Sequence, residues 1–188
     1  MNLAVVLLQF FATNSELGYR FTLPDGFAPF PAGRTQADIL DCWTEPVAAA
    51  ASGALVMCVQ RMHAVLPREA MTQEDLHGAA QLVSYKWKGF DIQGLRTDTT
   101  QDGLQVSVFV AQVPLRKEAV QLVIAGPRDQ ASRMAAIMTS TLASLEGETN
   151  WLTSAERSSR LGQGVGVIAA ILILALVVRI LRRRSHTA

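Results

Sequence analysis

The feature that most constrains this chain is an uncharged apolar run near its C-terminus, Leu161–Val178. As a helix, a run of 18 residues spans about 27 Å, close to the roughly 30 Å hydrocarbon core of a bilayer. Its valine, isoleucine and leucine residues favour insertion by about 3–6 kcal/mol in total, reduced by its glycines and Gln163. A buried helix of a soluble domain rarely stays uncharged over such a length. We therefore predict a transmembrane helix over residues 161–181 that anchors the chain in a lipid bilayer.

Both ends of the apolar run carry further signals. Arg179 follows Val178, and its long side chain can reach the headgroup layer. A basic tail, residues 182–188, comes next. At the start of the run, Gly162 and Gly166 form a GxxxG pair, a spacing that lets two membrane helices approach closely enough for a homodimer. Glycines at a helix start are also typical of a flexible beginning, so both interpretations stay open.

The orientation of the anchor follows from the arginines around it. Arg179 and Arg182–Arg184 outweigh Arg157 and Arg160, which places the tail in the cytoplasm and the preceding domain outside it. That topology needs an export signal, and Leu3–Ala12 has the length of a signal-peptide core but no basic residue before it and no clean cleavage site. The alternatives are that this segment is the first strand of the domain, or that the chain is tail-anchored with a cytoplasmic domain.

The charge of the remaining chain excludes one class of partner. Residues 1–160 carry a formal charge of −3, because they hold all 16 acidic residues but lack four of the 17 basic ones. An acidic domain without a basic stripe argues against nucleic-acid binding. About 160 residues suffice for one domain with its own core. We divide them into an apolar N-terminal segment (1–18), a domain (19–146) and a polar linker (147–160).

Two cysteines lie in neighbouring apolar runs, Ile39–Thr44 and Ala54–Val59. If these runs pair as a hairpin centred near residue 50, Cys42 and Cys58 face each other. A cross-strand disulfide is then within reach, as expected in an oxidising compartment. The other interpretation is a pair of buried free thiols, which are common core residues.

One segment, Met71–Lys88, shows helical spacing. Four of its apolar residues recur on one helical face: Leu76, Ala80, Val83 and Trp87. Thr72 followed by Asp75 resembles a capping box, and Gly89 is a typical helix stop. We predict a helix here.

The other segments predict strands and a second helix. Alternating apolar residues predict strands in Tyr19–Phe27, Asp91–Arg96 and Leu104–Val113. The dense apolar run Ala119–Ala125 predicts a central strand. After it, Gly126-Pro127 opens a helix whose apolar face includes Met134, Met138 and Leu142. The order of strands, helix, strands and helix predicts an α+β fold.

Several of these segments resemble the PsbP-like superfamily, which includes the photosystem subunit PsbP, the Ran-binding Mog proteins and bacterial envelope proteins. Tyr19–Phe27 resembles its F-x-L-P-x-G-F opening, Gln105–Pro127 its late hairpin, and the helix ending in Ser144-Leu145 its last helix. The resemblance covers roughly residues 19–150. It implies an antiparallel sheet flanked by helices, an α/β/α sandwich, in a protein that binds or stabilises other proteins without a catalytic centre. The membrane helix and the lack of a lipobox cysteine depart from the pattern, so only the fold and the binding character are carried over to what would be a bacterial member.

The sequence contains no motif for catalysis or for metal binding. His63 and His77 lack a cysteine or carboxylate at ligand spacing, so we predict no metal site and no cofactor. No nucleophile elbow, Walker loop or zinc-protease motif is present, and no catalytic residue is assigned. Trp151 can either pack on the domain or touch the membrane interface.

Three functions are compatible with these features. The first is a non-enzymatic, membrane-anchored binding or assembly module that supports a membrane or envelope protein complex. The second is a tethered carrier or sensor of a small ligand or metal, which predicts a deep pocket containing His63 or His77. The third is a hydrolase with dispersed catalytic residues. Because the chain shows no catalytic motif, we favour the first.

Overall fold

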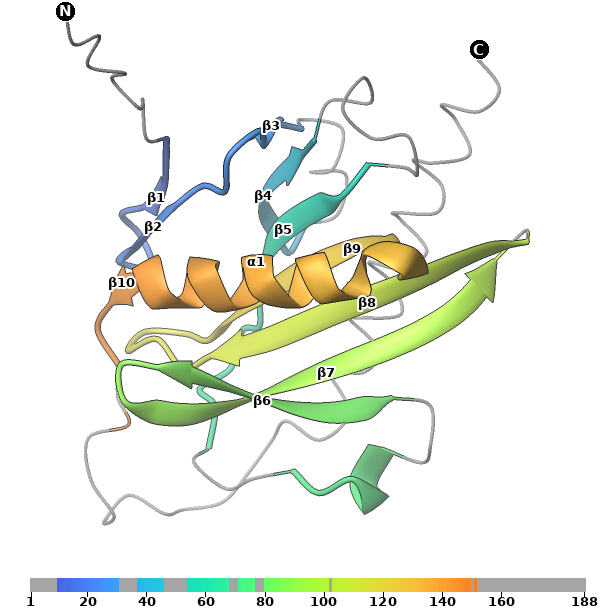
Figure 1. Ribbon diagram of the computed structural model, residues 1–188. Coiled ribbons are helices and arrows are strands. Elements are labelled where there is room, and N and C mark those ends of the chain that lie inside the picture. The colour runs from blue at the N-terminus through green and yellow to red at the C-terminus, as the bar shows by residue number, and fades with distance from the viewer. Residues whose placement is uncertain are drawn as a thin grey trace, which may run out of the picture.

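The structure, a computed structural model, describes residues 10–30, 37–45, 54–67, 71–76, 80–101, 103–149 and 151. These residues form a seven-stranded antiparallel sheet, a three-stranded antiparallel sheet and one α-helix that crosses a face of the large sheet (Figure 1). The strand order is β3-β4-β5-β9-β8-β7-β6 in the large sheet and β1-β2-β10 in the small one.

The strands of the large sheet are β3 (Ala28–Pro29), β4 (Ile39–Thr44), β5 (Val56–Arg61), β6 (Gln81–Trp87), β7 (Phe90–Gln101), β8 (Leu104–Val113) and β9 (Val120–Pro127). The small sheet consists of β1 (Phe11–Asn14), β2 (Tyr19–Thr22) and β10 (Glu146–Gly147). The prediction that the apolar run Ala119–Ala125 forms a central strand is confirmed. It forms most of β9, which lies between β5 and β8 and is buried from Val120 to Gly126 because both faces of the sheet are covered there.

The predicted helix over Met71–Lys88 is wrong. Among the described residues of this segment Glu74–Leu76 form a single 3-10 turn, and Gln81–Trp87 form β6, an edge strand. Val83 and Trp87 are four residues apart, a separation that suits both a helix face and a strand face. Lys88 and Gly89 both have positive φ, 48° and 81°, as a two-residue hairpin turn requires, and this turn pairs β6 with β7.

The second predicted helix is confirmed, with a later start. Pro127 stays in β9, Arg128–Gln130 forms a 3-10 turn, and α1 runs over Ala131–Ser144. Its buried residues are Met134, Met138, Thr141 and Leu142. Met134, Met138 and Leu142 pack on the large sheet together with side chains of β1 and β2, forming the larger core cluster. The indole Nε1 of Trp87 donates a 2.9 Å hydrogen bond to the Leu145 carbonyl and so ties the end of α1 to β6.

The antiparallel sheet is confirmed, but helices on both of its faces are not. Within the described ranges α1 is the only α-helix, and the opposite face of the sheet is packed by Leu76, Ala80, Met71 and Phe30 from turns and loops. The sandwich that the family resemblance implied is therefore not shown, and in the segment predicted as the other helix Gln81–Trp87 form β6.

The membrane segment lies outside the described residues. This applies to the predicted helix 161–181 with Leu161, Gly162, Gly166, Val178 and Arg179, to the basic tail, and to the first nine residues of the N-terminal segment. Among the residues that are described, no helix is long and apolar enough to span a membrane.

Candidate functional site

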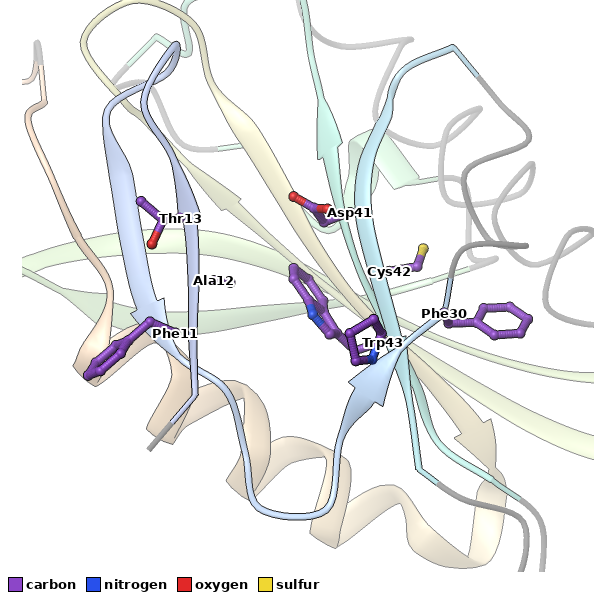
Figure 2. Close-up of a pocket in the computed structure, with 8 residues that line it drawn as sticks. Phe11, Ala12, Thr13, Phe30, Asp41, Cys42 and Trp43 are labelled. Atoms are coloured by element: carbon purple, nitrogen blue, oxygen red, sulfur yellow. The ribbon is translucent and has the colours of Figure 1, made fainter. Parts of the chain in front are cut away.

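A hollow of about 370 Å³ lies between β1 and the β3–β4 edge of the large sheet (Figure 2). We call it the β1–β4 groove. Its lining residues are Phe11, Ala12, Thr13, Pro29, Phe30, Asp41, Cys42 and Trp43. β1 and β4 belong to different sheets, so no backbone pairing between them closes this space.

The lining is mostly apolar and rests on the core. Trp43 is 5% exposed, and its ring meets that of Phe21 edge-on, with 5.7 Å between centroids. Ala12, the small residue opposite this wall on β1, is also buried. Thr13 and Asp41 supply the polar groups of the lining. Such a lining favours an apolar ligand or side chain with a few hydrogen-bonding groups.

Two adjacent aromatic residues at the start of the described chain are exposed, and the second of them, Phe11, lines the groove. Phe10 is 65% and Phe11 45% exposed, although both are large and apolar. The guanidinium carbon of Arg20 lies 3.8 Å from the Phe11 ring centroid, in cation–π contact. Exposed aromatics beside a groove are typical of interaction surfaces.

Cys42, at the back of the groove, is joined to Cys58 by a disulfide. The two residues are directly opposite each other on β4 and β5, which is the register expected from the spacing of the two apolar runs. Both sulfur-bearing side chains are buried. The disulfide is part of the smaller core cluster, and it fixes β4, one wall of the groove, to β5.

His63 does not enter the groove. It follows β5 on the surface, where its Nε2 lies 2.8 Å from Asp38 Oδ1 and its Nδ1 3.9 Å from Glu118 Oε2. The neighbouring Arg61 pairs with Glu16 and, at 3.3 Å, with Glu118. No group of three or more histidine, cysteine, aspartate or glutamate residues in the described part of the chain could hold a metal ion. His77 lies outside that part.

Trp151 packs on the domain, one of the two arrangements considered from the sequence. Its Nε1 donates a 3.0 Å hydrogen bond to the Leu66 carbonyl, and its ring meets the Phe90 ring edge-on at 5.8 Å. Nearby, the Lys88 ammonium donates a 2.6 Å hydrogen bond to the Gly147 carbonyl. Part of the segment expected as a linker is therefore fixed to the β6–β7 turn.

Sequence reasoning did not find the β1–β4 groove. Its residues come from segments that are adjacent only after folding, and no spacing rule joins Phe11–Thr13 to Asp41–Trp43. The pair Phe10-Phe11 gives no signal by itself, because its exposure is known only from the structure, in which Phe11, Ala12 and Thr13 are exposed, buried and exposed in turn. The sequence interpretation absorbed that pair into a signal-like apolar segment.

No protein-family model and no curated protein matches this sequence. Among solved structures, it is similar to the cyanobacterial PsbP (CyanoP) of Synechocystis sp. PCC 6803, with a TM-score of 0.51 and 11% identity over 78% of this chain and 96% of that one. LpqN of Mycobacterium tuberculosis, described as involved in cell envelope biogenesis, gives a TM-score of 0.48 and 12% identity over 73% of this chain and 88% of LpqN. A protein of Bacteroides thetaiotaomicron gives a TM-score of 0.47 and 14% identity. The match covers 70% of this chain and 46% of that protein, so the chain spans less than half of it.

The similarity to CyanoP concerns the fold, and it agrees with the resemblance that the sequence motifs indicated. The chain has a PsbP-like α+β fold, in which an antiparallel sheet carries one packed helix.

Proposed function

We propose that this chain is a non-catalytic binding domain, held at a membrane by residues 161–181, that supports a membrane or envelope protein complex. The observation that carries the proposal is the position of Trp151. The folded domain extends to this residue, which contacts Leu66 and Phe90, and nine residues separate it from the uncharged run Leu161–Val178. A domain so tethered has a raised effective concentration near membrane partners.

Two features support a binding rather than a catalytic role. The β1–β4 groove has a mostly apolar lining that includes the exposed Phe11. The PsbP-like superfamily that the sequence resembles consists mostly of proteins that bind or stabilise other proteins. We infer that the groove is the contact surface for a protein partner.

The disulfide supports an extracytoplasmic domain. Structural disulfides persist in oxidising compartments and are rare in the cytosol. A Cys42–Cys58 bridge is therefore consistent with a domain outside the cytoplasm and a cytoplasmic basic tail, the orientation that Arg179 and Arg182–Arg184 favour.

The anchor is tested by removing residues 161–188. The full chain should stay with membranes after carbonate extraction, whereas the shortened chain should be recovered in the soluble fraction. The orientation is tested with a phosphatase that is active only after export, inserted between Ser154 and Ala155, beyond the contacts of Trp151. Activity there, and inactivity of the same reporter placed after Ala188, is the expected result. Membrane retention of the shortened chain would contradict the anchor.

The groove is tested with a photo-crosslinking residue in place of Phe11 in cells that naturally make the protein. Leu104 is the matched control, because it is also a large apolar residue, 59% exposed, at the tip of the β7–β8 hairpin. A discrete crosslinked species from position 11 and none from position 104 is the expected result. Equal crosslinking from both positions would contradict a specific role for the groove.

A further inference from the structure

A second exposed surface lies at the end of the domain that holds Trp151. It combines aliphatic and aromatic residues with neighbouring basic ones. It is built from three segments that meet there: residues 65–67 after β5, the β6–β7 turn over residues 88–90, and Trp151. We call these segments the Trp151 face. Val65 is 50% exposed, Pro67 is exposed, and the Phe90 and Trp151 rings are half-buried against each other.

Two cations border the Trp151 face. Lys88 is exposed, and its ammonium reaches the Gly147 carbonyl, while Arg116 pairs with Glu148 at 2.8 Å with both side chains more than 70% exposed. Lys88 contacts Gly147, the residue before Glu148, so the three charged groups are close neighbours, and the pKa of Glu148 is lowered, first by the hydrogen bond from Arg116 and more weakly by Lys88. Together they leave an excess of one positive charge beside the exposed apolar residues.

The face lies at one end of the large sheet. β7 begins at Phe90, beside Trp151, and ends at Gln101, next to the turn that leads into Leu104. A strand of 12 residues spans about 36 Å. Figure 1 shows the β6–β7 turn and the tip of the β7–β8 hairpin at opposite ends of the molecule. The exposed apolar residues Val65 and Leu104 therefore mark two ends of the domain that are far apart.

We propose that the Trp151 face lies against the headgroup layer of the membrane, with the β7–β8 hairpin tip directed away from it. This inference rests on the proposed anchor. The connection to the predicted membrane helix starts at this end of the domain, and from Trp151 to Leu161 it reaches at most about 35 Å even when extended. Tryptophan beside exposed aliphatic residues and cations is the composition that the membrane interface favours.

The orientation has a consequence for the groove. Its wall β1 lies in the small sheet, and its lining residues include neither Val65 nor Trp151. With the Trp151 face on the lipid, the β1–β4 groove stays open to a partner in the same membrane. Lipid contact and partner binding then use separate surfaces of one domain.

The test uses the full chain reconstituted in vesicles of phosphatidylcholine and phosphatidylglycerol. A fluorescent label is attached to a single new cysteine, either Val65→Cys or its matched control Leu104→Cys. Both positions are exposed, and the native cysteines are bonded to each other and buried. Lipids that carry a spin label at the headgroup serve as the quencher. We expect loss of fluorescence and a blue shift of the label at position 65, with the label at position 104 unchanged.

The outcomes separate this proposal from the anchor. If the chain floats with the vesicles but neither label is quenched, or both are quenched equally, the orientation is overturned and the anchor stands. If the label at position 65 is shielded from aqueous iodide yet not quenched by the lipid, a protein covers the face and the lipid assignment is overturned. If the chain does not float with the vesicles, the anchor itself fails, and with it the proposal that rests on it.

Discussion

The ring of Tyr85 on β6 covers Gly94 on β7 so closely that no side chain fits at position 94. A Cβ there would lie 2.4 Å from Tyr85 Cε2 and 2.3 Å from the backbone oxygen of Val110 on β8. Gly94 pairs with Val83, so Tyr85 reaches it from the diagonal position two residues along β6. The glycine provides space for the close approach of an aromatic ring to the strand, and the ring covers the gap that the missing side chain leaves.

Replacement of this glycine tests the packing directly. Gly94→Ala should lower the free energy of unfolding by about 1–3 kcal/mol, because the added methyl group meets a backbone oxygen that cannot turn away. Urea unfolding followed by circular dichroism measures the change. Ser84→Ala, an exposed position on β6, is the control and should stay within about 0.5 kcal/mol. An unchanged midpoint for Gly94→Ala would contradict the packing described here.

The hydroxyl of Tyr85 is buried and has no hydrogen-bond partner among the described residues. Burial raises the pKa of Tyr85 to about 12, whereas a tyrosine in an unfolded chain titrates near pH 10. The folded state therefore holds this proton more tightly. The resulting contribution to stability is complete below pH 10 and is lost as the pH rises through 12.

Tyr85→Phe removes both the buried hydroxyl and its titration. Below pH 10 the variant should be more stable than the native chain by about 1 kcal/mol, because an unpartnered hydroxyl is no longer buried. Between pH 10 and 12 the native chain should lose stability more steeply than the variant. Urea unfolding at pH 7, 9, 10, 11 and 12 gives both quantities. Parallel pH profiles of the two proteins would show that Tyr85 does not titrate in this way.

The same strand shows where sequence reasoning reaches its limit. Val83 and Trp87 fit both a helix and a strand, and the residue that distinguishes the two, Tyr85, gains its partner only when Gly94 of β7 lies beside it. β9 could be predicted because its continuous apolar run has one favourable place, the middle of a covered sheet. The groove could not be predicted, because β1 and β4 belong to two different sheets and no local pattern encodes that they both line one hollow.

The end of β4 is held to α1 by a charged pair. The Arg133 guanidinium donates to both carboxylate oxygens of Glu45, and its Nη1 lies 2.9 Å from Oε2. Glu45 is only 4% exposed, so loss of its partner would leave a carboxylate poorly solvated. Arg133→Leu should therefore lower the free energy of unfolding by about 1–3 kcal/mol, less than for a fully buried pair because the arginine side chain is half-exposed.

A double-mutant cycle isolates the contribution of this pair. Arg133→Leu combined with Glu45→Leu should be less destabilised than the sum of the two single variants, because no unpaired carboxylate remains. Chemical unfolding of all four proteins supplies the comparison. Arg116→Leu serves as the exposed control, since Arg116 and Glu148 both lie in solvent, and its unfolding midpoint should not move. Strict additivity in the cycle would mean that the Glu45–Arg133 contact carries no stability of its own.

The Cys42–Cys58 disulfide gives a prediction that bears on the location of the domain. The bridge closes a loop between residues 16 apart in sequence, and loop closure of this size stabilises a folded chain by about 3 kcal/mol through the entropy of the unfolded state. Reductant should therefore lower the urea midpoint of the native chain. The double variant Cys42→Ala with Cys58→Ala should start near that lower midpoint and should not respond to reductant. If purified native chain shows two free thiols and no response to reductant, the bridge does not form and the support for an extracytoplasmic domain is withdrawn.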